Sequence, residues 1–190
     1  MSGATLTVLS GPSGCGKTTI RKEILKRHPD MLFSVSATTR PIRADETDGK
    51  DYFFLTRQEF EQSILMGDLI EYEMIYGEYY GSLRTQVDHA LDVGKTLLFD
   101  IDVKGALSIK KIYAGAATLI FIEPPSMKTL EERLKNRKTE SADALRKRLD
   151  RASMELEQWN TFDFCVVNDK LRDAIDEVDS IISGDAATAN

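Results

Sequence analysis

Near its N-terminus the chain carries the octapeptide Gly11-Pro12-Ser13-Gly14-Cys15-Gly16-Lys17-Thr18. It follows the apolar run Leu6-Thr7-Val8-Leu9, which predicts a buried strand, and it leads into a helical pattern over 17–28. The octapeptide matches G-x-x-x-x-G-K-[ST], in which glycines let several backbone N–H groups point at phosphate oxygens. Lys17 and the helix N-terminus add positive charge, and Thr18 offers a hydroxyl to Mg²⁺. These residues therefore predict a site for a nucleoside triphosphate with Mg²⁺.

Short apolar runs alternate with helical patterns along the rest of the chain. Strands are expected at 33–36, 96–99, 118–122 and 164–167, a polar loop at 38–50, and helices at 56–67, 82–93, 103–112, from 126 onward, at 141–159 and at 171–182. This alternation predicts an α/β fold of three layers, in which helices cover both faces of a parallel sheet. Ligands bind beyond the carboxyl ends of the strands in such a sheet, where residues 11–18, 100–102 and Asn168 are expected.

Asp100 ends the apolar run Thr96-Leu97-Leu98-Phe99. An acidic residue at such a strand end can organise Mg²⁺, usually through water, beside a phosphate loop. By itself the position fits a helix cap equally well. Together with Thr18, it predicts the metal site.

The composition indicates one domain over residues 1–190 with a net charge of −6. Such a charge gives no overall attraction to nucleic acid or anionic membrane, so phosphates must be bound by local Arg and Lys clusters. No apolar run is long enough for a membrane span, and the first residues lack the features of a signal peptide. Cys15 and Cys165 suggest no disulfide framework, which favours the cytoplasm. The oligomeric state stays open, and residues 184–190 are expected to be disordered.

The sequence predicts a second anion site in the loop after the predicted strand at 33–36. Arg40 and Arg43 follow the predicted strand at 33–36, close to Tyr52, and two guanidinium forks can share one small anion. The segment Tyr79-Tyr80-Gly81-Ser82 adds a phenol and a hydroxyl, and Glu71 can accept two N–H donors from a base edge. Taken singly, each of these residues fits an exposed loop charge or a core tyrosine equally well.

Arg133, Arg137 and Arg148 form a third basic cluster. Arg133 and Arg137 are one helical turn apart, so they share a face and could cover a triphosphate as a lid. The alternative is a surface helix with ordinary ion pairs, because several glutamates lie nearby in the sequence.

Taken in order, these motifs closely resemble the guanylate kinase family from about Val8 to Ile182. The resemblance rests on residues 11–18, Phe33-Ser34-Val35-Ser36-Ala37-Thr38-Thr39-Arg40, Asp48-Gly49-Lys50-Asp51-Tyr52, Tyr79-Tyr80-Gly81-Ser82, Asp100-Ile101-Asp102 and Val167-Asn168-Asp169. It implies a P-loop NTPase fold and the reaction ATP + GMP = ADP + GDP, which serves purine nucleotide metabolism.

The resemblance also implies a role for each site residue. The implied ATP ligands are Gly11, Pro12, Ser13, Gly14, Cys15, Gly16, Lys17, Thr18 and Asn168, the last near adenine, with Mg²⁺ at Thr18 and Asp100. The implied GMP ligands are Ser36, Glu71, Ser82 and Asp102 at guanine, and Arg40, Arg43, Tyr52 and Tyr80 at its phosphate. The implied catalytic residues are Lys17, Arg133, Arg137 and Arg148. Because adenine has no N–H where guanine carries N1–H, a buried Glu71 would favour GMP over AMP.

Three regions are implied within the single domain: a core over 5–32, 97–127 and 155–183, a GMP-binding region over 33–96 and a helical lid over 128–154. The chain departs from the family's usual pattern at Cys15, at Lys138 after Arg137, and at 42–46, which lack a common Pro-Gly pair. Cys15 is expected to be a tolerated small side chain. A second hypothesis is that the helix N-terminus and Lys17 lower its pKa and make it redox-sensitive.

Three other functions fit parts of the sequence. Asp102-Val103-Lys104-Gly105 matches the D-x-x-G pattern of GTPases, but the base-recognition pattern N-K-x-D is missing. A non-catalytic scaffold domain would not need Lys17, Thr18 and Asp100 together. A kinase for another acceptor, such as AMP, would not need Glu71.

Overall fold

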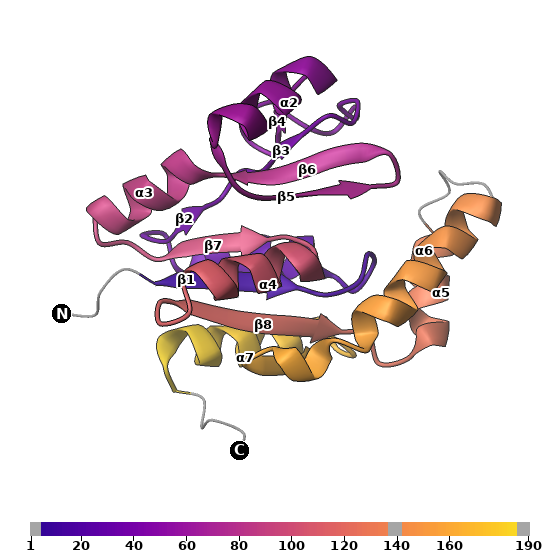
Figure 1. The fold of residues 1–190 in the computed structure, drawn as a ribbon. Coiled ribbons are helices and arrows are strands. Elements are labelled where there is room, and N and C mark those ends of the chain that lie inside the picture. Colours follow the sequence, from indigo (N-terminus) through magenta and orange to yellow (C-terminus); the bar gives the residue numbers. More distant parts are fainter. Residues whose placement is uncertain (1–4, 137–141, 186–190) are drawn as a thin grey trace.

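The computed structural model describes residues 5–136 and 142–185, and its core is a parallel sheet of five strands in the order β2-β7-β1-β8-β9 (Figure 1). Its strands are β1 (Leu6–Ser10), β2 (Leu32–Phe33), β7 (Leu97–Asp100), β8 (Ala117–Glu123) and β9 (Phe164–Val167). In register, Leu6 lies beside Leu97 on one side and Ala117 on the other. All five residues of β1 are buried, which is the pattern of a strand covered on both faces.

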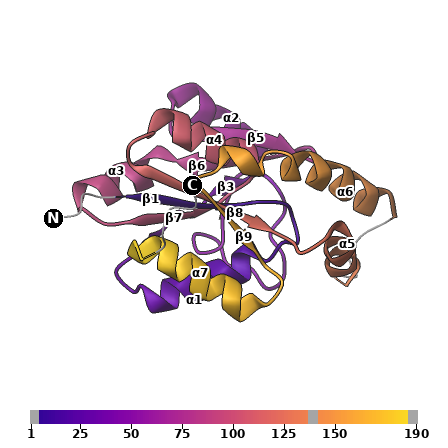
Figure 2. The ribbon, with the colours of Figure 1, turned by 90° about the horizontal axis from the view of Figure 1, so that it is seen from below.

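Helices cover both faces of this sheet, as Figure 2 shows, with α1 (Lys17–Arg27) and α7 (Leu171–Ser183) together on one face and α4 (Val103–Ile112) on the other. Ile20 and Ile24 of α1 and Val178 of α7 pack on Leu9 and Ile120 in one apolar cluster. A second cluster joins the opposite face of the sheet to α4 and to α3 (Arg84–Asp92). The α/β three-layer architecture predicted from the sequence is thus confirmed.

A second sheet lies above the first in Figure 1, with strand order β4-β3-β6-β5. Its strands are β3 (Ala37–Thr38), β4 (Phe53–Phe54), β5 (Leu69–Ile75) and β6 (Glu78–Leu83), and α2 (Arg57–Met66) packs beside it. Phe60 of α2 is fully buried and stacks on the Tyr79 ring at a centroid distance of 5.0 Å. The antiparallel β5–β6 hairpin places Glu71 opposite Ser82.

The prediction of one strand at 33–36 is wrong, because this segment passes from the first sheet to the second. Leu32 and Phe33 pair with β7, the Ser34 N–H still donates to the Leu98 carbonyl at 2.9 Å, and the chain joins the second sheet at Ala37. Between them, the Gln86 side-chain amide forms two hydrogen bonds with the backbone of Val35, at 2.8 and 2.7 Å. A side chain of α3 therefore replaces the neighbouring strand at this point.

The predicted helix at 82–93 begins later than expected, and Ser82 does not cap it. Ser82 lies in β6, and α3 starts at Arg84 after Leu83, which provides no side-chain cap. The predicted helix at 141–159 ends earlier, since α6 spans Ala142–Leu156 and a short 3-10 helix covers Trp159–Thr161.

The other helix limits agree with their sequence signals. Thr56 and Glu59 form the expected capping box of α2, and Gly67 ends that helix in the left-handed conformation. Ser126 accepts from the Thr129 N–H at the start of α5 (Met127–Lys135). Helices α5 and α6 extend beside the carboxyl end of the sheet in Figure 1 and share an apolar cluster of Leu130, Leu134 and Ala152.

No helix within 5–136 or 142–185 combines the length and apolar character that a bilayer span requires. Within the expected tail, Gly184 ends α7 in the left-handed conformation, and residues 186–190 lie outside the described residues.

Leu119 tests the core directly, because it is fully buried in β8, an interior strand of the sheet. We expect Leu119→Ala to lower the free energy of unfolding by about 3 kcal/mol, since it removes apolar contacts and leaves a cavity. Leu65→Ala is the matched control, because Leu65 is 87% exposed on α2 and its loss should cost less than about 0.5 kcal/mol. Urea unfolding of both variants measures the difference, and equal losses would contradict this description of the core.

Candidate active site

The octapeptide 11–18 forms the turn between β1 and α1 at the carboxyl end of the sheet. Gly11, Gly14 and Gly16 all have positive φ angles, of 131°, 92° and 104°. These conformations turn the loop so that its backbone N–H groups and the start of α1 can face an anion. The loop geometry therefore suits a phosphate chain.

Gly16 and Asn168 fit against each other behind this loop. The Asn168 side chain is buried, and its Nδ2 donates to the Cys15 carbonyl at 2.7 Å. A Cβ atom at position 16 would collide with that same Nδ2 atom. Arg133 of α5 in turn donates to the Asn168 carbonyl at 2.9 Å. Asn168 and Arg133 thus support the loop from outside the cleft.

Lys17 and Thr18 begin α1 and face the cleft. The Lys17 ammonium donates to the Gly11 and Pro12 carbonyls at 2.6 and 3.2 Å, so it lies across the loop. Burial opposes its charge, but nearby groups that include Asp100 outweigh this, and the pKa of Lys17 lies above its usual value. The side chain is therefore a fixed positive charge where phosphates would lie.

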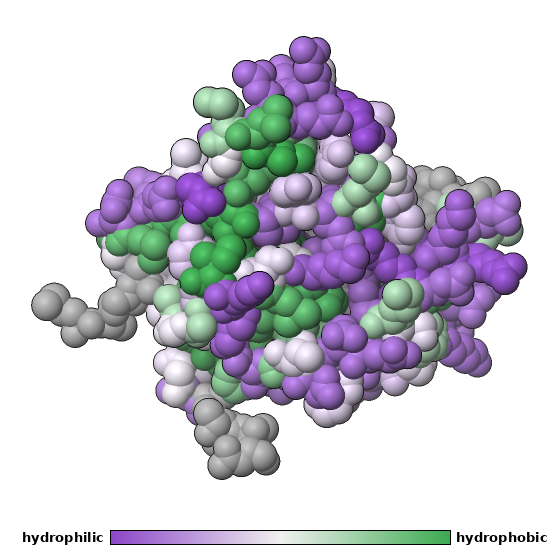
Figure 3. Space-filling model, viewed as in Figure 1, coloured by the Kyte–Doolittle hydropathy of each residue, from purple (hydrophilic) through white to green (hydrophobic). Residues whose placement is uncertain are grey.

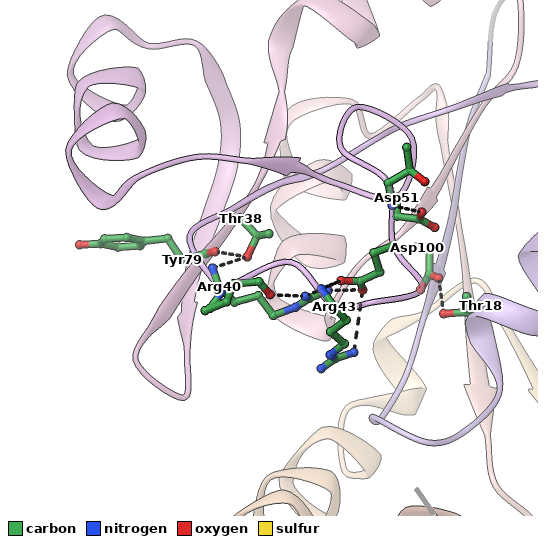
Figure 4. Close-up of polar contacts among 10 residues, drawn as sticks. Thr18, Thr38, Arg40, Arg43, Asp51, Tyr79 and Asp100 are labelled. Carbon is green, nitrogen blue, oxygen red and sulfur yellow. Dashed lines mark hydrogen bonds and ion pairs between the residues drawn. The ribbon is translucent and has the colours of Figure 1, made fainter. Parts of the chain in front are cut away.

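Thr18 and Asp100 meet at the carboxyl ends of β1 and β7, as Figure 4 shows. The Thr18 hydroxyl donates to Asp100 Oδ2 at 3.1 Å. A hydroxyl and a carboxylate are the hard oxygen ligands that Mg²⁺ prefers, and this ion usually takes its remaining ligands from water and substrate phosphates. Among the described residues, no group of three or more His, Cys, Asp or Glu side chains could hold a metal alone. The donor pair fits Mg²⁺ carried by a nucleotide.

A cleft of 1020 Å³ runs from this loop to the second sheet and to α6. It is lined by most of the residues that the sequence singled out: Gly11, Ser13, Gly14, Gly16, Lys17, Thr18, Ser36, Arg40, Arg43, Tyr52, Glu71, Tyr80, Asp100, Asp102 and Arg148. Pro12, Cys15, Ser82, Arg133 and Asn168 do not line it. Arg137 lies outside the described residues, as does Lys138.

The loop after β3 forms the second basic part of the cleft, and Figure 4 shows Arg40 and Arg43 on this one loop. The Thr38 hydroxyl anchors its start by donating to the Tyr79 carbonyl at 2.8 Å. Arg40 forms two hydrogen bonds with the Glu46 carboxylate, at 2.7 and 2.5 Å, and these lower the pKa of Glu46. Arg43 is exposed, so its guanidinium can turn toward an anion.

Aromatic rings surround Arg40. Its guanidinium lies over the Tyr52 ring at 5.0 Å from the centroid, and the Tyr52 and Tyr80 rings are 6.1 Å apart. Burial raises the pKa of Tyr52, so its phenol stays protonated and can donate to an anion. The arrangement offers two guanidiniums and two phenols to one small dianion.

Glu71 and Asp102 form the acidic part of the cleft. Ser82 is fully buried and donates to Glu71 Oε1 at 2.6 Å, which fixes the carboxylate from behind. Burial raises the pKa of Glu71, although the Ser82 hydrogen bond opposes this. Gly105 leaves room for both carboxylates, because a Cβ there would lie 2.7 Å from Glu71 Oε2 and 2.9 Å from Asp102 Oδ1. Ser36 lines the same cleft.

Asp102 begins α4 and accepts from the Gly105 N–H at 3.0 Å. Burial and the neighbouring Glu73 carboxyl raise the pKa of Asp102 to about 7. Burial also acts to raise the pKa of Glu73, but hydrogen bonding with Asp102 and Lys104 lowers it below its usual value. Glu71 and Asp102 therefore line this end of the cleft, and the Glu73 carboxyl lies beside Asp102.

Several lining residues were not among the sequence predictions. They include Arg21, which is buried in α1 beneath Phe33, Glu46 beside Arg40, and Arg151 and Glu155 on α6. Glu46 follows Arg43 by three residues, and Arg151 follows Arg148 by three. This spacing to a predicted site residue was the sequence signal that could have identified them. Only the fold shows that these side chains turn into the cleft.

The hypothesis that Cys15 has a lowered thiol pKa is wrong. Cys15 is fully buried in the apolar cluster below the sheet, and this burial raises the pKa of its thiol. Lys17 and its backbone N–H act in the opposite direction but do not outweigh burial. Cys15 is therefore a neutral core thiol, as the first interpretation expected.

Comparisons with known proteins agree with this geometry. The family model described as guanylate kinase matches residues 3–185. The guanylate kinase of Chlorobaculum tepidum is 50% identical over 91% of this chain and 89% of its own, and that of Salinibacter ruber is 48% identical over 93% and 94%. The crystal structure of guanylate kinase from Anaplasma phagocytophilum aligns with a TM-score of 0.82 at 29% identity, over 100% of this chain and 88% of that one.

Gly16 allows a specific test of the phosphate loop. We expect Gly16→Ala to weaken ATP binding by at least about tenfold, because its φ of 104° is strained for alanine and its Cβ would push Asn168 away from Cys15. Gly94→Ala is the control, since Gly94 also has a positive φ but no atom within 4 Å of the added Cβ. Calorimetric titration of both with ATP shows whether the loss of affinity is specific to the phosphate loop, and equal affinities would contradict this role.

Proposed function

This chain belongs to the guanylate kinase family, which phosphorylates GMP to GDP with ATP, and we propose how its own cleft divides that reaction between two nucleotide sites. The supporting observation is a single cleft with a phosphate loop and Lys17 at one end, and Arg40, Tyr52 and Glu71 at the other. Phosphoryl transfer depends mainly on positioning and charge stabilisation, and this cleft supplies both.

On the ATP side, the backbone of residues 11–16 binds the phosphates and Lys17 contacts the β- and γ-phosphates. Asn168 contributes by fixing the loop through the Cys15 carbonyl, which is 2.7 Å from its Nδ2. Its Oδ1 is buried and has no hydrogen-bond partner among the described residues, and an adenine amino group would supply that partner if the cleft extends to Asn168 when ATP binds. Mg²⁺ would be held by Thr18, and by Asp100 through water, and would supply charge neutralisation between the phosphates.

On the GMP side, Glu71 accepts from N1–H and the 2-amino group of guanine, and Asp102 and Ser36 complete the base site. Ser82 acts through Glu71, because it is buried behind that carboxylate. Arg40, Arg43, Tyr52 and Tyr80 bind the GMP phosphate. Arg40 would exchange its Glu46 partner for the phosphate, a tetrahedral dianion that offers two oxygens to the same guanidinium fork.

We assign residues 33–96 to the GMP-binding region, 128–154 to the lid and the remainder of 5–183 to the core. Arg148 supports the lid assignment, since it lines the cleft and lies over the Tyr76 ring of the β5–β6 hairpin at 5.9 Å. Arg148 and Arg137 would neutralise charge on the transferring phosphoryl group. Arg133 would act indirectly, by holding the Asn168 carbonyl. We also place the protein in the cytoplasm, consistent with its two free cysteines.

The acceptor is tested with ATP and Mg²⁺ in a coupled assay that compares GMP, dGMP, AMP, CMP and UMP. We expect Glu71→Ala to lower kcat/KM for GMP by about 100-fold or more, because two charge-assisted hydrogen bonds to guanine are lost, while KM for ATP changes little. Glu61→Ala, on exposed α2, is the control. An unchanged ratio of GMP to AMP activity in Glu71→Ala would contradict base recognition, and GTP hydrolysis without an acceptor would favour a GTPase.

The metal assignment predicts a distinct effect of Asp100→Asn. Replacing the carboxylate by an amide weakens the hold on hydrated Mg²⁺. We expect the Mg²⁺ concentration for half-maximal activity to rise by about tenfold or more, with KM for GMP nearly unchanged. Activity measured against free Mg²⁺ at saturating nucleotides provides the test, and a wild-type Mg²⁺ dependence would remove Asp100 from the metal site.

A further inference from the structure

Arg151 of α6 connects three parts of the molecule at the acidic end of the cleft. Its Nη2 donates to Asp102 Oδ2 at 2.7 Å and lies 3.6 Å from Glu73 Oε1, while its Nε donates to Glu155 Oε1 at 2.7 Å. The side chain is 24% exposed, so these contacts are largely shielded from water. Figure 3 shows hydrophilic residues gathered over α6 on this face.

The Asp102 and Glu73 carboxyl groups next to Arg151 repel each other when both are ionised. Asp102 and Glu73 are buried to a similar degree, with side chains 15% and 12% exposed, and Glu71 and Asp102 both lie against Gly105. Repulsion between like charges grows as water is excluded. The Gly105 N–H fixes only one oxygen of Asp102, which leaves Oδ2 to be held by another donor. Arg151 provides that donor.

Lys104 cannot replace Arg151 in this task. Its ammonium pairs with Glu73 Oε1 at 2.8 Å, but its side chain is 78% exposed, so water screens much of its charge. Glu73 Oε2 is buried and has no hydrogen-bond partner within the described residues. Arg151 lies between Glu73 and Asp102, where its charge offsets the repulsion between them.

We propose that Arg151 is a positioning residue for guanine recognition, which aims the Asp102 carboxylate at the base and separates it from Glu73. This inference rests on the proposed function, because it takes Asp102 as a guanine ligand. Arginine suits the task since its fork lets Nη2 hold Asp102 while Nε is fixed by Glu155. Without Arg151, Asp102 Oδ2 would turn away from Glu73 and from the orientation that accepts a guanine N–H.

Steady-state kinetics of Arg151→Gln and Arg151→Lys test the proposal. We expect Arg151→Gln to raise KM for GMP by about tenfold, with kcat and KM for ATP within about twofold of wild type. Arg151→Lys should recover part of this loss, because it restores the charge without the fork. Arg146→Gln is the matched control, an exposed arginine on the same helix, and should leave KM for GMP unchanged.

Asp102→Asn and the double variant Asp102→Asn/Arg151→Gln separate this inference from the proposed function. Asparagine can still accept the Gly105 N–H, so α4 keeps its cap. We expect Asp102→Asn to raise KM for GMP, and the double variant to be no worse than Asp102→Asn, because Arg151 acts through Asp102.

The other possible KM values distinguish the guanine role of Asp102 from the positioning role of Arg151. A wild-type KM for GMP in Asp102→Asn overturns the guanine role of Asp102, and the inference with it. A raised KM in Asp102→Asn but not in Arg151→Gln overturns the positioning role alone. If the double variant raises KM for GMP by the product of the two single effects, Arg151 does not act through Asp102, and the positioning role is overturned. A fall in kcat of Arg151→Gln as large as its rise in KM also overturns this role, because Arg151 would then act on a step other than guanine binding.

Discussion

In the proposed function, two phosphate-bearing anions approach each other in this cleft, and their mutual repulsion is the constraint on which its arrangement depends. The chain has a net charge of −6, so attraction comes from local groups. At one end these are the backbone N–H groups of residues 11–16, the start of α1 and Lys17. At the other end they are Arg40 and Arg43. The first end lies at the carboxyl end of β1 in the parallel sheet, and the loop after β3 of the second sheet supplies the other end of the same cleft.

The charged groups that would bind GMP are already paired with other side chains. Arg40 is paired with Glu46, Asp102 with Arg151, and Glu71 with the Ser82 hydroxyl. A charge in a half-buried cleft is costly when it has no partner, so these contacts keep each group oriented. On GMP binding, Arg40 would exchange Glu46 for the phosphate, while Arg151 and Ser82 would keep holding Asp102 and Glu71. The cost of ordering the site is met during folding, before the nucleotide arrives.

Local signals in the sequence predicted much of this fold, because they act between near neighbours. The phosphate loop, the capping box at Thr56 and Glu59, and the buried strand at 118–122 all agree with the structure. The β5–β6 hairpin was missed, since its strands mix apolar, acidic and aromatic residues and are defined by their pairing. The strand predicted at 33–36 was wrong because Gln86, about 50 positions away, binds the Val35 backbone. The cleft residues Glu46 and Arg151 were missed for the same reason, since their importance depends on which partners the fold brings to them.

The most direct test of the two-site cleft is a crystal structure with GMP and a non-hydrolysable ATP analogue bound together. The account predicts the GMP phosphate beside Arg40 and Arg43, with guanine facing Glu71, and the analogue's phosphates on residues 11–18 with Mg²⁺ near Thr18. A monophosphate bound far from Arg40, Arg43 and Glu71 would contradict it.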